Sequence, residues 1–135
     1  GQPGSVSKLC LSCHDGSVAV GAYGYTPSSS IGTTNVKASG SILIGGGTGD
    51  LQNHHPIGFD YGEVAAVDLE IKDPTSELLG GSGGNPNSLT INDLLWGGKV
   101  ECSSCHDVHN TKNTGMKFVW VEDTQSNLCL SCHAK

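Results

Sequence analysis

All six cysteines of this chain fall into pairs separated by two residues, and a histidine follows each pair directly. The three segments are Cys10–His14, Cys102–His106 and Cys129–His133, and no cysteine lies outside them. Residues at i, i+3 and i+4 of a helical turn project from the same side, so this spacing gathers two thiols and one imidazole on one face. These three segments constrain the fold of this 135-residue chain more than any other feature of the sequence does.

The CxxCH pattern is the covalent attachment signature of c-type haem. Both thiols of a pair can form thioether bonds to the vinyl edge of one porphyrin, while the histidine reaches the iron from the same face. The sequence therefore predicts three covalently attached haem c groups. Their attachment residues are Cys10, Cys13, Cys102, Cys105, Cys129 and Cys132, and their proximal ligands are His14, His106 and His133.

Three other interpretations of the cysteines fit less well. Disulfides within CxxC pairs would be strained and redox-labile, and a structural framework of three bridges usually spaces its cysteines more widely. Zinc sites use CxxC pairs two at a time and do not explain a histidine after every pair. A thioredoxin-like centre needs one CxxC in a βαβ context, which is not found here.

The chain has three further histidines, as many as the axial iron positions that the proximal histidines leave open. These are His54, His55 and His109, and we predict that each is the distal ligand of one bis-histidine haem, so that His14, His54, His55, His106, His109 and His133 bind iron. Met116 is the only thioether in the chain and could ligate one iron with a raised potential. Because the histidines already suffice, we interpret Met116 as a packing residue.

Chain geometry restricts which haem each distal histidine can serve. His109 lies three residues after His106, on the same side of the chain, so it must ligate a different haem, and the third is favoured because Cys129 follows closely. His55 precedes Pro56 and is biased to extended backbone, where adjacent side chains point to opposite sides. His54 and His55 should then serve two haems, and if all ligation lies within one chain, the Cys102/Cys105 haem is one of them. Irons reached from neighbouring residues must lie close together.

The composition predicts a fold with little regular structure. Only 36% of the residues are hydrophobic and 20 are glycine, so porphyrin faces must supply part of the apolar core. We predict a single trihaem domain over residues 1–135, mostly irregular, with a few short helices at the CxxCH motifs, minor short strands, and the chain wrapped around three haems.

Local patterns predict the individual elements. Helices are expected at Ser7–His14 and Ser126–His133, the latter with Thr124 as N-cap, and a helical turn at Asp93–Trp96. Residues 63–69 are ambiguous between helix and strand. Strands are expected at 42–44 and 118–121, and loops at 25–41 and 80–88. Trp96 and Trp120 are interpreted as packing against porphyrin or loops.

The charge balance excludes several partners. Seven basic against 13 acidic residues give a net charge of -6, which disfavours nucleic acid and anionic membrane surfaces. No apolar run approaches the roughly 20 residues of a membrane helix, so we expect no membrane span. The chain does not begin with Met, and we expect Gly1 to start a processed mature chain.

Two segments resemble those of a known family. Asn53–Phe59 (NHHPIGF) and Cys102–His109 (CSSCHDVH) are similar to the NHHP and CxxCHxxH segments of secreted multihaem c-type cytochromes with doubled CxxCH motifs, a group that includes the extracellular cytochrome filaments called nanowires. The resemblance implies low-spin bis-histidine haem, export before haem attachment and long-range electron transfer.

The expected function is electron transfer rather than enzymatic catalysis, because two imidazoles on each iron leave no open position for a substrate. We expect a subunit of an extracellular filament whose partners are other copies of the chain, in a head-to-tail polymer, and redox proteins or extracellular electron acceptors. A monomeric periplasmic shuttle is the alternative. A small haem reductase with one open axial site would require an idle histidine. The expected location is secreted, extracellular or periplasmic.

Overall fold

The computed structural model describes residues 2–14, 51–52, 54–80, 88–109 and 118–134. The chain divides into two compact units. The larger unit comprises Gly1–Val6 and Ile57–Lys135, and the smaller unit comprises Ser7–Pro56. The second and third CxxCH motifs lie in the larger unit, and the first lies in the smaller unit.

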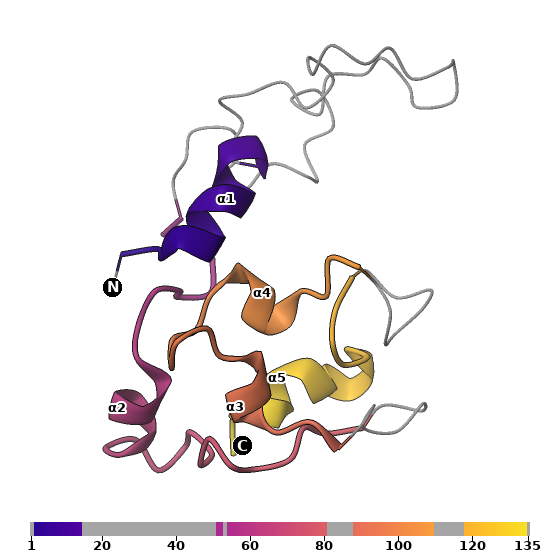
Figure 1. Ribbon diagram of the computed structural model, residues 1–135. Coiled ribbons are helices and arrows are strands. Elements are labelled where there is room, and N and C mark those ends of the chain that lie inside the picture. The colour runs from indigo at the N-terminus through magenta and orange to yellow at the C-terminus, as the bar shows by residue number, and fades with distance from the viewer. Residues whose placement is uncertain (1, 15–50, 53, 81–87, 110–117, 135) are drawn as a thin grey trace. The chain divides into compact units, whose positions relative to one another are not determined.

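The described residues form short helices joined by irregular chain (Figure 1). The helices are α1 (Ser5–His14), α2 (Tyr61–Ala65), α3 (Ile91–Leu94), α4 (Cys102–Cys105), the 3-10 turn η5 (Thr124–Ser126) and α5 (Asn127–Cys132). In these residues β-structure is limited to isolated bridges between single residue pairs. The predicted fold class, mostly irregular with short helices at the CxxCH motifs, is confirmed.

Local hydrogen bonds start the helices of the larger unit. The Asp60 carboxylate accepts from the Glu63 amide at 3.1 Å and caps α2. At α3, the Asp93 carboxylate accepts from both the amide and the hydroxyl of Thr90 at 2.8 Å. Helices of four to six residues are too short to be stable alone. Their packing in the unit must therefore stabilise them.

Several element predictions need correction. Thr124 is not the N-cap of α5: it begins η5, its hydroxyl donates to Glu122, and Ser126 occupies the N-cap position. The strand predicted at 118–121 is wrong, because Phe118 has φ +53 and only Val119 forms a bridge, with His106. A non-glycine residue in the left-handed region breaks the extended geometry that a strand requires.

Three other predictions have mixed outcomes. The turn predicted at 93–96 is helix α3, which starts two residues earlier. The ambiguous segment 63–69 is helical only to Ala65 and then turns. The strand predicted at 42–44 and the loop predicted at 25–41 lie outside the described residues, as does most of the loop at 80–88.

A tight turn brings the chain into the second motif. Trp96 and Lys99 exchange backbone hydrogen bonds of 3.0 and 3.2 Å across Gly97 and Gly98. These glycines have φ values of +60 and +80. A two-residue hairpin loop with two positive φ angles favours glycine at both positions, which explains the Gly-Gly pair.

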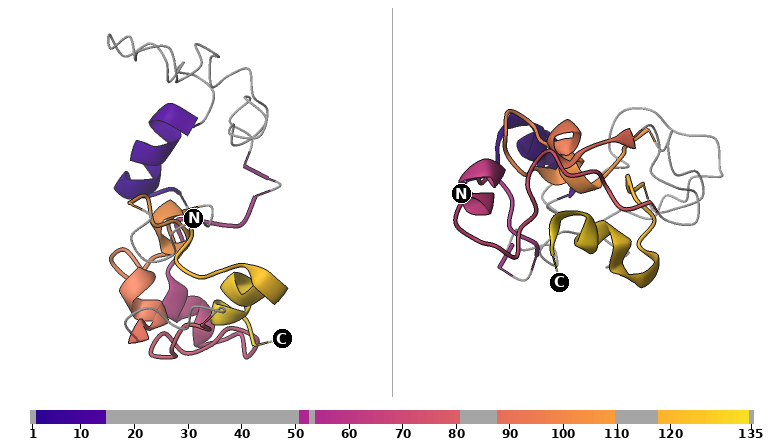
Figure 2. Two further views of the ribbon diagram at one scale, coloured as in Figure 1. Left: turned by 90° about the vertical axis from the view of Figure 1, so that its right-hand side faces the viewer. Right: turned by 90° about the horizontal axis from the view of Figure 1, so that it is seen from below.

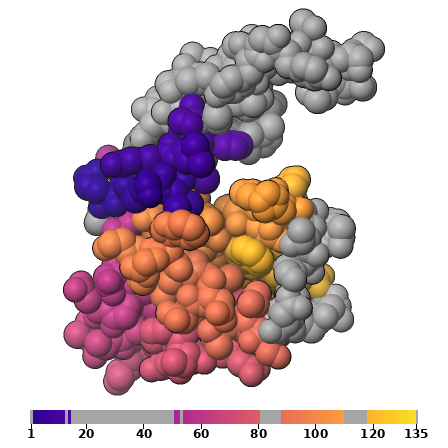
Figure 3. Space-filling view, viewed as in Figure 1, coloured from indigo at the N-terminus to yellow at the C-terminus, as the bar shows by residue number. Residues whose placement is uncertain are grey.

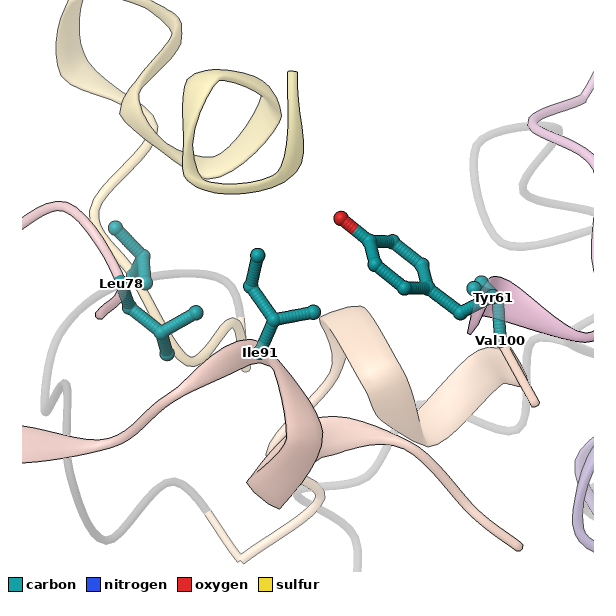
Figure 4. Packing of buried hydrophobic residues seen from close by; sticks show 5 residues of the cluster. Tyr61, Leu78, Ile91 and Val100 are labelled. Atoms are coloured by element: carbon teal, nitrogen blue, oxygen red, sulfur yellow. The ribbon is translucent and has the colours of Figure 1, made fainter. Parts of the chain in front are cut away.

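A small hydrophobic core organises the larger unit (Figure 4). Its buried residues are Tyr61, Leu78, Ile91, Val100 and Val121. They come from α2, α3 and the irregular segments between the helices. Leu128 and Cys132 of α5 pack against this core, so the core supports the third motif directly. α3 also contacts α4, which carries the second motif.

Long-range backbone pairing holds these segments together. Gly58 donates to Val100 at 2.7 Å, and Val100 donates to Phe59 at 3.1 Å. Tyr61 donates to Gly98 at 3.0 Å, which continues the antiparallel register. The chain that follows the His54–His55 pair in the sequence is thus hydrogen-bonded to the chain that leads into α4.

Figure 2 shows the same helices from two further directions, and Figure 3 shows the segments of the larger unit, from magenta through orange to yellow, in contact at its surface. No helix in the described part of the chain is long and apolar enough to span a membrane.

Candidate haem-binding site

The first motif lies in the C-terminal half of α1. Cys10 is half-buried in this helix, and His14 is its last residue and is exposed. Cys13 lies one turn after Cys10, and the Ser12 hydroxyl between them donates to the Leu9 carbonyl at 2.6 Å. The helix thus provides the i, i+3, i+4 arrangement that CxxCH attachment needs.

The second motif forms the single turn α4. Cys102 and Cys105 are half-buried, and His106 follows the helix in extended conformation with an exposed side chain. The Cys105 carbonyl accepts from the Trp120 amide at 3.2 Å. The Trp120 indole donates to the Ser103 carbonyl at 2.8 Å. Trp120 therefore holds two carbonyls of this turn from the opposite segment. Trp96, in contrast, is 61% exposed.

A buried carboxylate connects the second motif to the N-terminal segment. Glu101, which is 2% exposed, precedes Cys102 directly. Its two carboxylate oxygens accept from the Gly4 amide at 2.9 and 3.1 Å. Its own amide donates to the Ser104 hydroxyl at 3.0 Å. Charge-assisted bonds of this kind are about twice as strong as neutral ones, so Glu101 positions α4 against residues nearly a hundred positions away.

The third motif forms α5 and lies beside the segment that follows α2. Lys72 donates its amide to the Cys132 carbonyl at 2.9 Å, and its ammonium group donates to the Leu130 carbonyl at 2.6 Å. His133 forms a bridge with Ile71. The Tyr61 hydroxyl donates to the Lys72 carbonyl at 2.9 Å and lies 3.4 Å from the Cys132 carbonyl. The C-terminal end of α5 is thereby fixed on the core.

A serine precedes the second cysteine of every motif, at Ser12, Ser104 and Ser131. In the third motif, the buried Ser131 hydroxyl donates to the Asn127 carbonyl at 2.8 Å and accepts from the Leu79 amide at 3.0 Å. Ser104 accepts from Glu101 in the second motif. This repeated serine is a sequence signal for positioning that the pattern of cysteines and histidines alone does not reveal.

The thiols of the second and third motifs influence one another. Burial, and to a lesser extent the neighbouring thiols of Cys132, Cys129 and Cys102, which would each place negative charge nearby, together raise the pKa of the Cys105 thiol to about 11. Burial also raises the pKa of Cys132. The five described cysteine side chains are free thiols. Two haems attached at these motifs would therefore be anchored close to each other in the larger unit.

The three predicted distal ligands are all exposed. His55 has its Nδ1 2.8 Å from the Pro56 carbonyl, and the His54 amide donates to the Leu51 carbonyl at 3.0 Å. The His109 amide donates to the Asp107 carboxylate at 3.1 Å, which turns the chain after the second motif. The iron that each would bind stays a prediction, and Met116 lies outside the described residues. No three His, Cys, Asp or Glu side chains in the described ranges are grouped closely enough to hold a bare metal ion.

The residues beside the motifs fit a porphyrin. Leu9 is 73% exposed, Val108 is 64% exposed and Phe118 is 54% exposed. Leu9 precedes Cys10, Val108 follows His106 by two residues, and the Phe118 carbonyl accepts from Asp107 at 2.8 Å. Large apolar side chains that are this exposed are stabilised when another apolar surface covers them. A porphyrin attached at the adjacent cysteines would supply an apolar face for them, while the thiols and imidazoles supply the covalent and iron bonds.

Three residues that position the motifs could not be identified from the sequence. Glu101 adjoins its motif but is acidic, and an acidic residue is rarely buried, so nothing in the sequence indicated its role. Lys72 and Tyr61 are 58 and 71 residues away from the α5 carbonyls that they approach. Only the folded chain brings them together.

Comparison with known proteins finds a match for the C-terminal part of the chain. Residues 97–135 match the family model described as the doubled CXXCH motif. No curated protein and no solved structure gives a significant match to the chain. The match covers the second and third motifs together. It supports a c-type multihaem cytochrome-like protein with covalently bound haem c and a role in electron transfer.

Proposed function

We propose that the chain transfers electrons through three closely spaced bis-histidine haems, one at each CxxCH motif, and that it works as a subunit of an extracellular cytochrome filament. The observation that carries the proposal is that α5 packs on the core of the larger unit and α4 contacts α3, which contributes to the same core, so two attachment motifs are anchored in one small unit. Haems that are close together allow electrons to pass between them without any bond being made or broken.

The number of histidines, two for each of three irons, supports a role without enzymatic catalysis. His14, His106 and His133 supply one imidazole to each iron, and His54, His55 and His109 supply the other. When bound, the haem supplies a one-electron couple of the iron. The chain's own residues attach the group, occupy both axial positions and cover its apolar faces. Partners in this proposal are further copies of the chain and redox proteins or extracellular acceptors.

The polymer and the extracellular location rest on the resemblance of residues 53–59 and 102–109 to segments of secreted filament cytochromes. Negative-stain microscopy of the native material tests this part. Filaments support it, whereas discrete small particles at high protein concentration would favour the monomeric periplasmic shuttle.

The haem count and ligation are tested by intact mass and a visible spectrum on the same sample. We expect a mass equal to the chain plus three haems, and low-spin iron at all sites. A mass without haem would reject the proposal entirely. Carbon monoxide binding by the native reduced protein would indicate an open axial site and favour the reductase.

A further inference from the structure

A positive charge is held against the third motif. The Lys72 ammonium group donates to the Leu130 carbonyl, which lies between Cys129 and Cys132 in α5. The Lys72 amide bonds the Cys132 carbonyl as well, so the residue is attached to this motif at two points. The contact is partly buried. A cation therefore lies near the sulfur that would carry the third haem.

Acidic side chains flank the second motif instead. Glu101 precedes Cys102 directly and is 2% exposed, and Asp107 follows His106 directly and is 3% exposed. Both carboxylates are held by hydrogen bonds to backbone amides, at Gly4 and His109 respectively. Near the third motif, Asp73 and Glu70, on either side of Lys72 in the sequence, are both exposed, so water and salt screen their charges more effectively than those of the buried carboxylates.

These opposite charges act on the redox equilibria of the two haems. A bis-histidine haem loses one unit of positive charge when it is reduced. A nearby cation therefore favours the reduced form, and nearby carboxylates favour the oxidised form. Partly buried charges are screened less than surface charges, so their effect persists at moderate salt.

We infer that the haem at Cys129 and Cys132 has a higher reduction potential than the haem at Cys102 and Cys105, and that Lys72 is the residue that raises it. An electron that enters the haem pair at the second and third motifs is then more stable on the third haem. Electron transfer within this pair is therefore favoured from the second motif to the third. The inference rests on the proposed electron-transfer function and adds the order of its potentials.

The order is tested first on the unaltered holoprotein. Haem methyl protons are followed by NMR while the ambient potential is stepped. The third haem is identified by Overhauser effects from the Tyr61 ring, and the second by effects from the Trp120 indole. We expect the third haem to be reduced first. Reduction of the second haem before the third would overturn the inference.

Charge variants then test the role of Lys72. In Lys72→Met, the ratio of reduced to oxidised third haem at fixed potential should fall about tenfold, equivalent to about 59 mV for one electron. Lys72→Arg keeps the charge and the donor to Leu130, so it should keep the potential. Lys99→Met removes an exposed charge in the same unit and is the matched control, with no shift expected beyond the error.

A complementary variant does not touch the third motif. Glu101→Gln keeps the shape and one acceptor oxygen for the Gly4 amide but removes the charge, and it should raise the potential of the second haem alone. If Lys72→Met loses a haem, the Glu101→Gln variant and the order of haem reduction in the unaltered protein still test the inference. Unchanged potentials in both variants would reject the inference, while an intact low-spin spectrum and haem mass would leave the proposed function standing.

Discussion

The Tyr61 hydroxyl donates a 2.9 Å hydrogen bond to the backbone carbonyl of Lys72. This bond joins the start of α2 to the segment that holds the third motif. The phenol is buried in the core, and the same oxygen approaches the Cys132 carbonyl. The link from α2 to the end of α5 therefore passes through one side chain.

The first prediction concerns alkaline stability. Burial raises the pKa of Tyr61 above its ordinary value of about 10, because the phenolate would be poorly solvated. The folded state thus binds this proton more tightly than the unfolded state. The contribution of the protonated Tyr61 phenol to the free energy of unfolding is therefore complete below pH 10. It is lost as the pH rises above 10 toward the pKa that Tyr61 has in the folded state.

Tyr61→Phe tests this directly. The variant should lose about 1 kcal/mol at neutral pH from the missing hydrogen bond. Its free energy of unfolding should then fall less than that of the unaltered protein between pH 9 and 11.5. Chemical denaturation followed by circular dichroism measures both. Parallel pH profiles of the two proteins would contradict the prediction.

The second prediction concerns Gly4. A Cβ added there would overlap with the carboxylate of Glu101, a buried residue whose backbone amide is bonded to Ser104 of α4. Gly4→Ala should therefore destabilise the larger unit by about 1–3 kcal/mol, the usual cost of overpacking. Gly62→Ala is the control, because its Cβ would make only an ordinary contact at 3.5 Å with Asp60 within α2. Equal stability of the two variants would show that the Gly4–Glu101 contact does not position the motif.

The third prediction compares two serines at the same motif position. Ser131→Ala leaves the Leu79 amide without its hydroxyl acceptor in a buried place, which should cost about 1–3 kcal/mol. Ser12 is exposed and its hydroxyl donates to the Leu9 carbonyl of its own helix, so Ser12→Ala should change the free energy of unfolding much less. Thermal unfolding of the two holoproteins distinguishes them. A larger loss in Ser12→Ala would be inconsistent with the buried network.

The fourth prediction concerns distal ligation. His54→Ala, His55→Ala and His109→Ala should each convert one of three haems to high-spin iron, because each removes one axial imidazole. Met116→Leu is the control and should leave the visible and electron paramagnetic resonance spectra unchanged. A high-spin fraction in Met116→Leu, together with an unaltered spectrum in one histidine variant, would assign that iron to the thioether.

The fifth prediction concerns the haem-free chain. Five buried hydrophobic residues form the core of the described part of the larger unit. Such a core should not offset the chain entropy of folding without porphyrin faces. Chain produced without haem attachment should show no cooperative unfolding transition by circular dichroism. A native-like transition would mean that the polypeptide folds independently of the haems.

Much of the local structure was predictable from the sequence. The CxxCH spacing predicted helical turns at all three motifs. The failures at Thr124 and at residues 118–121 have a common cause. Left-handed backbone at Gln125, Ser126 and Phe118 runs against the preference of these residue types, so tertiary contacts must impose it.

By itself, the sequence determined the attachment chemistry, because the thiols and the imidazole of each motif are neighbours on one helical turn and need no distant partner. Only the tertiary structure decided which groups surround each motif. Gly4 meets Glu101 across 97 residues, and Lys72 meets Leu130 across 58. Such pairs carry no local periodicity, since they depend on how the irregular segments close on a shared core. The Lys72 charge beside the third motif, and the burial of Glu101 beside the second, therefore became visible only in the folded chain.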